Sequence, residues 1–582
     1  MEIRQFLGCR SEFRCSAQLP VRSHSEMATR SKAIRLSLIC SAAVFVIVAL
    51  ITLVLVLVFD RLFLSILYKQ LAILPGSTVF ESWSAPSVPV YFSVYLFNLT
   101  NEAELLKGAA PRLHEVGPFV YRENREKFDI VFPEEISPKT VDFKHRIFYH
   151  FVPEMSVASP ELGKITIPNL FTAGLLERQS PVFFMNGPFA TLSPYDAMWN
   201  HYPLLFSSIN VGLFASQNGT KPVQYKIHTG SHDISKVGSI IEVNGQKKLS
   251  VWDHEEANMI NGSDGSNAPP GLEVGSTIQF YVNDICRSVV SYAVAKTQAI
   301  NRPDIELLVF TGTPPDPQDP ANDWRQRMFC KSGQGCPPKG LLALSPCLAA
   351  TGESVPLYLS QPYFLGADPS IVQAFDQFPD PIPERHSTWV HIEPTTGFVL
   401  EAFKRIQFNL LMKNQGEIFQ DMAGPYYFPL GWIEERAVAD KDTLDMLHNK
   451  LFAPRKIMPF ILSVVGAVST LISILLIVLL VTYSRRRTIQ NRTKRSGAHK
   501  QHAVSVNLSH SKMGPSDQQT PGLSSGPGAN TQVPEAKPLL NVTETADVNR
   551  IILSSMLNRC HLSDSYFSLS WKPNGEAFVA KT

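Results

Sequence analysis

The amino-acid sequence lacks several patterns that would assign a chemistry to it. It contains no H-E-x-x-H zinc motif, no phosphate-binding P-loop and no C-x-x-C pair. Its charge is nearly balanced, with 53 Lys and Arg against 51 Asp and Glu, so no global basic field favours nucleic acid. We find no internal repeat period. These absences argue against an enzyme, a bound cofactor and a nucleic-acid partner.

Two long runs without any charge are present instead. Residues 36–59 form an uncharged run of 24, and residues 457–484 form one of 28 that is rich in Ile, Leu and Val. A bilayer core needs about 20 apolar helical residues, so both runs are long enough to span it. The alternatives are a buried core helix or, for the first run, a cleaved signal peptide, whose apolar region is usually only about 7–15 residues long. We expect two transmembrane helices.

Positive charges flank both runs on one side only. Arg30, Lys32 and Arg35 precede the first run, and Arg485 begins a basic stretch after the second. Because Lys and Arg mark the cytoplasmic side, residues 1–35 and 485–582 are expected to be cytosolic tails. The tail after the second run is rich in Ser, Gly, Gln and Pro and is expected to be mostly disordered. Residues 60–456 then lie outside the cell or in an organelle lumen.

Half of the eight cysteines fall close together in this outside segment. An even number in an oxidising compartment predicts two disulfides, with three possible connectivities. A zinc site is the competing use of four cysteines, but extracytosolic thiols usually oxidise. The four residues are Cys286, Cys330, Cys336 and Cys347.

Three N-x-S/T sequons in the same segment predict a glycoprotein. Sequons in the predicted cytosolic tail would be out of reach of the glycosylation machinery. The candidate sites are Asn98, Asn218 and Asn261.

The outside segment reads as one α+β domain dominated by antiparallel sheet. Asn244-Gly245 is a preferred two-residue hairpin turn between two strand-like runs. In residues 404–412 apolar and polar side chains alternate, which predicts a half-solvated antiparallel strand. Residues 169–206 are more typical of helices, although Pro181, Pro188 and Pro194 interrupt the pattern. The acidic cluster in residues 252–256 is expected to be a solvated turn, since strand neighbours alternate faces and cannot converge on a metal.

Several motifs in order carry a resemblance to a known family. They are EVGPFVYRE (115–123), YKIHTGSHDISKVG (225–238), NMINGSDG (258–265), NDICRSVV (283–290), LYLSQPYFLGADP (357–369) and HIEPTTGFVLEAFKRIQFNLL (391–411). With them, the chain resembles the class B scavenger receptors, which include the fatty-acid translocase and the lysosomal integral membrane protein type 2. The resemblance covers roughly residues 36–484.

The resemblance implies a disulfide pairing. Cys286 would join Cys347, and Cys330 would join Cys336. Members often have a further cysteine where this chain has Ala257, so no third bridge is expected. The neighbouring Arg287 is expected to pair with a carboxylate or to point to solvent.

The resemblance also implies a fold and a function. Members have a barrel-like sheet with an apical helical bundle and a lipid tunnel, and they bind lipids or lipoproteins and pass lipid toward the bilayer. The ligand-receiving apex would correspond to about Asn169 to Tyr202, where residues 182–185 and Phe189 either pack inside the bundle or contact lipid. The alternatives are an endolysosomal cargo receptor for a soluble hydrolase and a two-span channel subunit. Homo-oligomerisation stays open.

The C-terminal tail contains a candidate sorting signal. EAKPLL (535–540) has one acidic residue and two adjacent leucines at the spacing that sorting adaptors bind. Glu535, Leu539 and Leu540 therefore predict adaptor binding and residence in endosomes or lysosomes, whereas without this signal the plasma membrane is the expected location.

Overall fold

The computed structural model describes residues 24–506, apart from 87, 135–137, 171–186, 200–211, 216, 220–221, 313–318, 334, 351–354 and 414–421. The chain separates into two compact units, Met1–Gln490 and Asn491–Thr582. In the second unit, the only described residues are the last turns of one helix.

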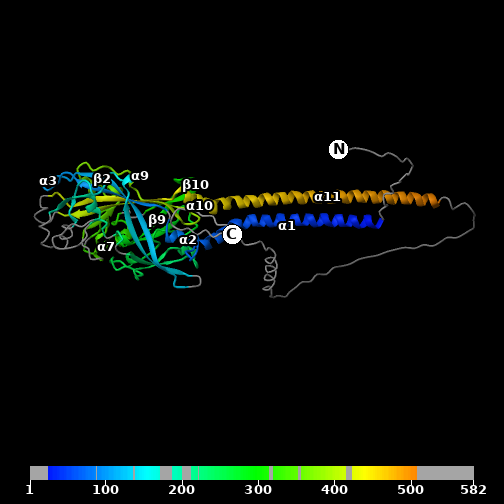
Figure 1. Ribbon diagram of the computed structural model, residues 1–582, viewed down its shortest axis with the longest axis horizontal. Helices are drawn as coiled ribbons and strands as arrows, with labels where there is room; N and C mark the ends of the chain where they lie inside the picture. The colour runs from blue at the N-terminus through cyan, green and yellow to red at the C-terminus, as the bar shows by residue number, and fades with distance from the viewer. Residues whose placement is uncertain are drawn as a thin grey trace, which may run out of the picture. The chain divides into compact units, whose positions relative to one another are not determined.

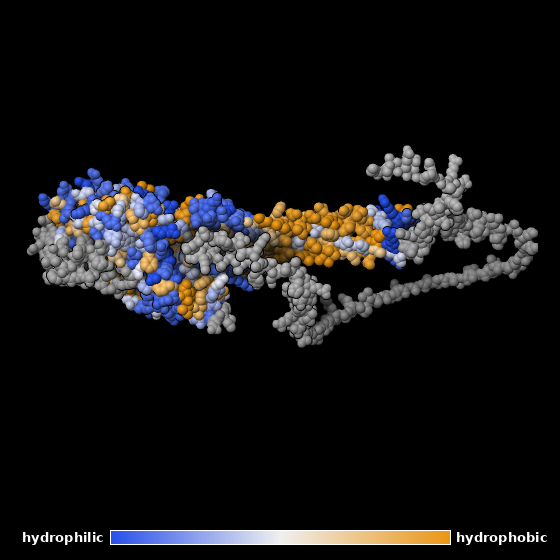
Figure 2. All heavy atoms as spheres, in the orientation of Figure 1, coloured by the Kyte–Doolittle hydropathy of each residue, from blue (hydrophilic) through white to orange (hydrophobic). Residues whose placement is uncertain are grey.

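Two long helices carry the uncharged runs. Helix α1 extends over His24–Gln70 and helix α11 over Ala453–Val506. Their apolar side chains are largely exposed (Figure 2), as expected for helices that face lipid. Helix α11 continues past residue 484, so the tail begins with a helical segment that the sequence analysis did not predict. At the other end of the uncharged runs, Arg455 pairs with Asp60 at 2.8 Å and ties the two helices together.

The chain between the two helices forms a 13-stranded antiparallel sheet that is nearly closed as a barrel (Figure 1). Its main order is β7-β6-β3-β2-β1-β15-β14-β13-β10-β9-β8, with β12 against β14 and β11 against β12, while β4 and β5 form a separate pair. The strands are β1 (Val90–Leu99), β2 (Leu113–Val131), β3 (Thr140–Phe151), β4 (Ile165–Pro168), β5 (Phe189–Leu192), β6 (Val223–His228), β7 (Ile240–Val243), β8 (Thr277–Val282), β9 (Arg287–Ala299), β10 (Arg302–Thr311), β11 (Leu342–Ala343), β12 (Leu357–Ser360), β13 (Trp389–Ile392), β14 (Val399–Met412) and β15 (Tyr426–Val438).

Short helices connect the strands. Ser77 caps the first of them by accepting a hydrogen bond from the Phe80 amide at 3.0 Å. The α-helices are α2 (Thr78–Ser84), α3 (Glu102–Leu105), α5 (Pro194–Met198), α6 (Trp324–Arg327), α7 (Ser345–Ala350), α8 (Pro369–Gln373), α9 (Pro383–His386) and α10 (Lys441–Leu447). Single turns of other helix types are η1 (Pro153–Met155), η3 (Ile234–Lys236), η4 (Glu256–Asn258), η5 (Asn283–Ile285), η6 (Pro362–Phe364) and η7 (His448–Phe452).

The seam of the barrel lies between its edge strands β7 and β8. Residues 262–263 bridge these strands: the Ile240 amide donates to the Gly262 carbonyl at 2.8 Å, and the Ser263 amide donates to the Gln279 carbonyl at 3.1 Å. At residue 262 an added Cβ would lie 2.1 Å from the Gln279 carbonyl oxygen. Only glycine therefore lets the bridging segment approach β8 this closely.

Two expectations about local structure are wrong. Strand β14 is buried on both faces, not half-solvated: Gln407 and Asn409 are fully buried. The segment 360–364 covers this face, where the Gln407 side chain accepts from the Tyr363 amide at 2.7 Å. Residues 189–192, expected to be helical, form strand β5.

The Asn244-Gly245 turn is confirmed. Val243 and Gln246 exchange backbone hydrogen bonds of 2.9 Å around it, and both central residues have positive φ. The run after the turn forms no strand and makes only isolated bridges, from Gln246 to Val243 and from Lys248 to Met259.

Candidate functional site

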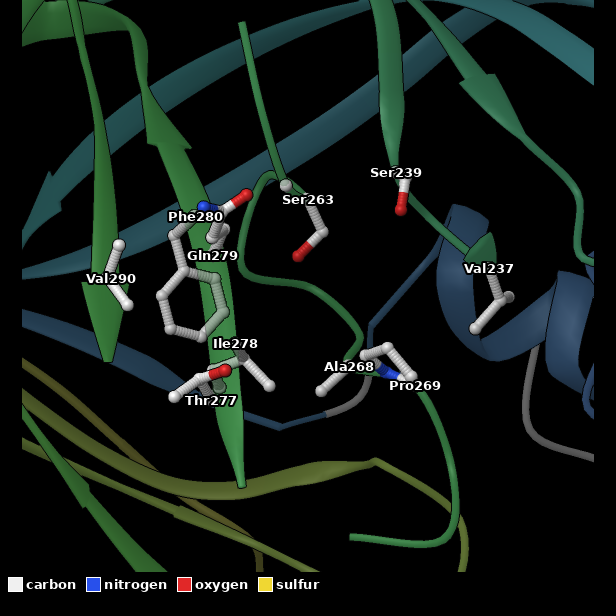
Figure 3. Close-up of a pocket in the computed structure, with 11 residues that line it drawn as sticks. Val237, Ser239, Ser263, Ala268, Pro269, Thr277, Ile278, Gln279, Phe280 and Val290 are labelled. Atoms are coloured by element: carbon white, nitrogen blue, oxygen red, sulfur yellow. The ribbon is translucent and has the colours of Figure 1, made fainter. Parts of the chain in front are cut away.

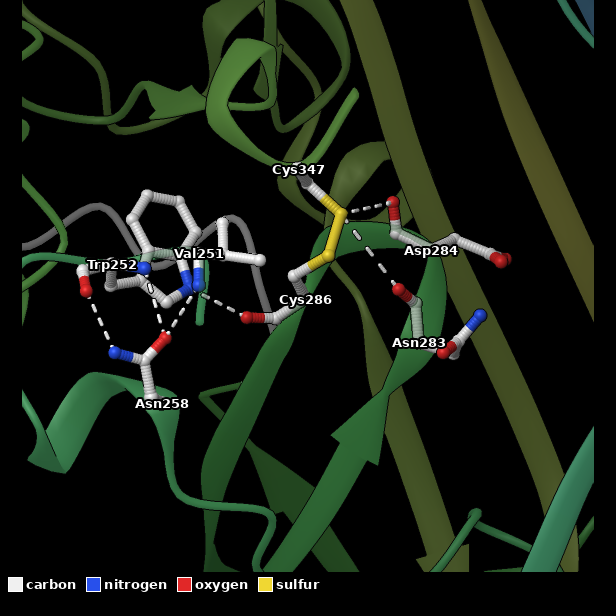
Figure 4. Close-up of a disulfide and its surroundings, with 7 residues drawn as sticks. All are labelled: Val251, Trp252, Asn258, Asn283, Asp284, Cys286 and Cys347. Atoms are coloured by element: carbon white, nitrogen blue, oxygen red, sulfur yellow. Dashed lines mark hydrogen bonds between the residues drawn. A yellow bond between two sulfur atoms is a disulfide. The ribbon is translucent and has the colours of Figure 1, made fainter. Parts of the chain in front are cut away.

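A disulfide fixes the end of strand β8. Cys286 follows η5 with a left-handed backbone (φ 49°) and is joined to Cys347 of α7, with the Cα atoms 5.7 Å apart (Figure 4). A second disulfide links Cys330 to Cys336, with Cα atoms 4.8 Å apart. Both bonds follow the pairing that the resemblance implies. Cys286 is therefore a structural half-cystine that holds a strand end in place.

The expectation for Arg287 is wrong. Its side chain is buried, with the residue 4% exposed, and no ion pair joins it to a carboxylate in the described part of the chain. Its guanidinium carbon lies 4.0 Å from the centroid of the Phe329 ring and 4.7 Å from that of Trp252. Burial lowers the pKa of Arg287 to about 9. Two aromatic faces thus take the place of a counter-ion.

Asn258 holds Trp252 in this position. Its side-chain oxygen accepts from the Val251 and Trp252 amides, each at 2.9 Å, and its amide donates to the Trp252 carbonyl at 2.7 Å (Figure 4). The indole nitrogen in turn donates to the Cys286 carbonyl at 2.8 Å. The four residues that follow the tryptophan are exposed, which confirms the solvated turn. This turn therefore packs on the disulfide and places no metal ligands together.

The inner face of the sheet is apolar in two regions. One region, called the disulfide cluster, includes Cys347 and inward side chains such as Phe92, Tyr121, Ile406 and Ile433. The other, called the α1 cluster, includes Leu71 and Ile73 just after helix α1, together with inward side chains of β3 and β6, which are Val141, Phe143, Tyr225 and Ile227. Leu67 and Tyr68 at the end of α1 pack against it. The apolar interior therefore reaches the helix that carries the first uncharged run.

Charged side chains separate these two clusters along the inner face. On β2, Tyr121 belongs to the disulfide cluster and Ile130 packs against the α1 cluster, while the inward residues between them are charged. Arg125 donates to Glu123 at 2.6 Å and also pairs with Glu435 of β15. We call Glu123, Arg125, Lys404, Glu435 and Asp284 the charged belt.

The sequence analysis missed the belt. Its signal is the alternation E-x-R-x-K in β2, which places Glu123, Arg125 and Lys127 on one face of the strand. Such a pattern ordinarily marks a solvated face. Nothing local to β2 shows that the charged face is the inner one.

A cavity of about 330 Å³ lies at the seam between β7 and β8 (Figure 3). Apolar side chains of Ile278, Phe280 and Val290 line one wall of it, and Ser239 and Ser263 face it from the bridging side. It is a mixed polar and apolar site on the wall of the barrel.

The structure places the other predicted site residues as follows. Asn218 and Asn261 are exposed, and Asn98 is half-buried on β1, where its side-chain oxygen accepts from the Thr166 amide at 2.8 Å. Phe189 is buried in β5. Most of the expected apex, including residues 182–185 and Tyr202, lies outside the described residues, as do Glu535, Leu539 and Leu540.

Apolar helices that precede and follow a disulfide-bonded, nearly closed barrel in the sequence define an integral membrane protein with one large domain between its spans. The chain belongs to the CD36 family, whose family model matches residues 41–509.

Named relatives are similar over most of their length. Lysosome membrane protein 2 of Homo sapiens is 28% identical over 431 residues, which cover 70% of this chain and 87% of the relative. Sensory neuron membrane protein 1 of Heliothis virescens is 28% identical over 448 residues, covering 69% of this chain and 82% of the relative. The chain is therefore a scavenger receptor-like membrane protein.

Proposed function

We propose that the barrel binds lipids or the lipids of lipoproteins and passes them toward the bilayer. The observation that carries this proposal is the α1 cluster, in which inward residues of β3 and β6 pack together with residues at the end of helix α1. An apolar interior that reaches the membrane helix would shield an acyl chain at about 0.8 kcal/mol per CH₂ group.

The proposed function can be tested by blocking the interior of the barrel with a bulky side chain. Ala402 and Ala437 are cross-strand partners on β14 and β15, and Ala402 shares the inward face with Lys404. Both alanines are only half-buried, so Ala402→Trp should fill open interior space. Arg436→Trp is the matched control, because Arg436 is an exposed neighbour that points outward.

The full chain is reconstituted in liposomes, and transfer of a fluorescent sterol from donor particles is timed. Wild type and Arg436→Trp should accelerate transfer several-fold over protein-free liposomes, and Ala402→Trp should not. If wild type is no faster than liposomes alone, the lipid-transfer proposal fails. If Ala402→Trp keeps full activity, lipid does not pass along this face.

We also propose that both termini are cytosolic and that Glu535, Leu539 and Leu540 bind sorting adaptors, which would place the protein in endosomes or lysosomes. The name of the relative lysosome membrane protein 2 supports this location. Imaging of the tagged full chain beside a Leu539→Ala/Leu540→Ala variant tests it. Movement of the variant to the cell surface is expected, and an unchanged distribution would rule the motif out.

The exposed sequons at Asn218 and Asn261 are proposed to carry N-linked glycans, with Asn98 as a third site. Each Asn→Gln variant should migrate faster on a denaturing gel by the mass of one glycan. A variant with unchanged mobility would show that its site carries no glycan.

A further inference from the structure

The charged belt contains one more negative than positive charge. Glu123, Arg125, Glu435 and Lys404 form a chain of ion pairs with two charges of each sign, the last pair at 2.9 Å. Asp284 is the fifth member, and no cation in the described part of the chain forms an ion pair with it. Lys127 and Asp264, which interact further along the inner face, cancel each other. The excess charge therefore belongs to Asp284.

Asp284 faces the interior of the barrel. Its carboxylate points away from the Cys286–Cys347 disulfide (Figure 4). Enclosure by the surrounding protein raises the pKa of this carboxyl, and the charges of Lys404 on β14 and Arg125 on β2 act in the opposite direction. Burial first, and the charge of Asp284 second, raise the pKa of Tyr281 on β8 to about 12. Groups from opposite walls thus converge on this residue.

The same groups are accessible to a ligand. Asp284 is exposed although it faces these interior groups, and the Lys404 side chain is 36% exposed. Open space inside the barrel therefore adjoins the belt. A molecule in this space could reach both apolar clusters with its chain and the belt with its polar end.

A second carboxylate has one oxygen without a donor. The Glu123 side chain is 1% exposed, and its Oε2 has no hydrogen-bond partner, while Oε1 accepts from Arg125. A buried carboxylate oxygen without a donor is costly, and burial accordingly raises the pKa of Glu123. The Asn283 side chain donates to Asp284, which can accept further hydrogen bonds from a ligand. Neither carboxylate, when ionised, is complementary to an anion.

We propose that the charged belt binds the polar end of an amphiphilic lipid that carries a hydrogen-bond donor and no negative charge, such as a hydroxyl or a primary ammonium group. The belt then discriminates against fatty-acid carboxylates, which meet its excess negative charge. This inference rests on the proposed lipid-binding function and names the class of lipid that the barrel prefers.

Competition binding tests the preference. The full chain in detergent is loaded with a fluorescent reporter lipid, which is displaced at pH 7.4 by monooleoylglycerol, oleylamine or oleate. Wild type should bind the first two at least tenfold more tightly than oleate. Asp284→Asn should raise the affinity for oleate at least tenfold and lower the affinity for oleylamine, because it removes the excess negative charge. Asp380→Asn is the matched control, since Asp380 is an exposed carboxylate outside the belt.

The outcomes separate the two proposals. If all three lipids bind wild type equally, the role of the belt is overturned and lipid binding stands. If none of them displaces the reporter and the reporter itself does not bind saturably, lipid binding fails and the belt proposal fails with it. Glu123→Gln provides a second variant, and it should weaken oleylamine without weakening oleate. Gel filtration and circular dichroism exclude misfolding of either variant.

Discussion

The two disulfides should differ in how much they stabilise the protein. Cys286 and Cys347 are 61 residues apart, whereas Cys330 and Cys336 are 6 apart. The informative perturbation is to replace each pair by alanine separately in the full chain. Both variants lose one bond and two sulfur atoms, so they are matched in chemistry and differ mainly in the length of chain that is released.

The magnitude follows from loop-closure entropy in the unfolded state. A loop of 61 residues gives about 4 kcal/mol, and a loop of 6 residues gives about 2 kcal/mol. Burial adds to the difference, because Cys347 is 5% exposed within the disulfide cluster while Cys336 is exposed. The Cys286/Cys347 variant should therefore lose at least about 2 kcal/mol more than the Cys330/Cys336 variant.

Urea unfolding of the purified full chain in detergent, followed by tryptophan fluorescence, measures this order. Wild type should unfold at the highest urea concentration, the Cys330/Cys336 variant next and the Cys286/Cys347 variant first. Wild type treated with reductant should unfold like a variant that lacks both disulfides. Equal midpoints for the two variants, or a lower midpoint for Cys330/Cys336, would refute the entropic reasoning.

Three further predictions concern single residues. Arg287→Met should keep or raise the thermal unfolding temperature, because it retains contact with both rings and removes a charge without a counter-ion, whereas Arg287→Ala should lower it. Burial alone would raise the pKa of Glu435, but the neighbouring cations of the belt outweigh it and hold the pKa at about 2, below the ordinary 4.5. The stabilisation from Glu435 is thus present above pH 4.5 and lost as pH falls toward 2, so wild type should lose more stability than Glu435→Gln between pH 5 and pH 3 in unfolding experiments. Gly262→Ala should cost more stability in urea than Gly245→Ala, since both have positive φ but only Gly262 has a carbonyl oxygen 2.1 Å from an added Cβ; Gly245→Ala should cost about 1 kcal/mol, and equal costs would contradict the close approach at the seam.

Patterns within short stretches could be read from the sequence. The turn at Asn244-Gly245 formed because only residues that tolerate positive φ suit it, and this requirement is local. The alternation in residues 404–412 correctly indicated a strand, since a period of two follows from backbone geometry alone. Its outer face was misjudged, because the segment that covers Gln407 comes from residues 360–364, far away in the sequence.

The candidate site was predictable only at its covalent anchors. The number of cysteines predicted two disulfides, and the family resemblance implied their pairing. Nothing near Arg287 in the sequence predicts that two aromatic rings, from residues 252 and 329, pack on it. The charged belt could be predicted even less from the sequence. Its members come from β2, η5, β14 and β15, and a strand with charges at every second position carries no information on which side will be enclosed.

The sequence by itself determined the two membrane helices, the dominance of antiparallel strands and the family, because apolar run length, period and motif order are properties of contiguous residues. Only the tertiary structure decided which face of each strand is interior, which rings pack on Arg287 and where the excess charge of the belt lies. Pairing of β2 and β15 on the two sides of β1 brings residues more than 250 positions apart, such as Arg125 and Glu435, into contact, and the energies of those contacts depend on distance in space and not on position along the chain.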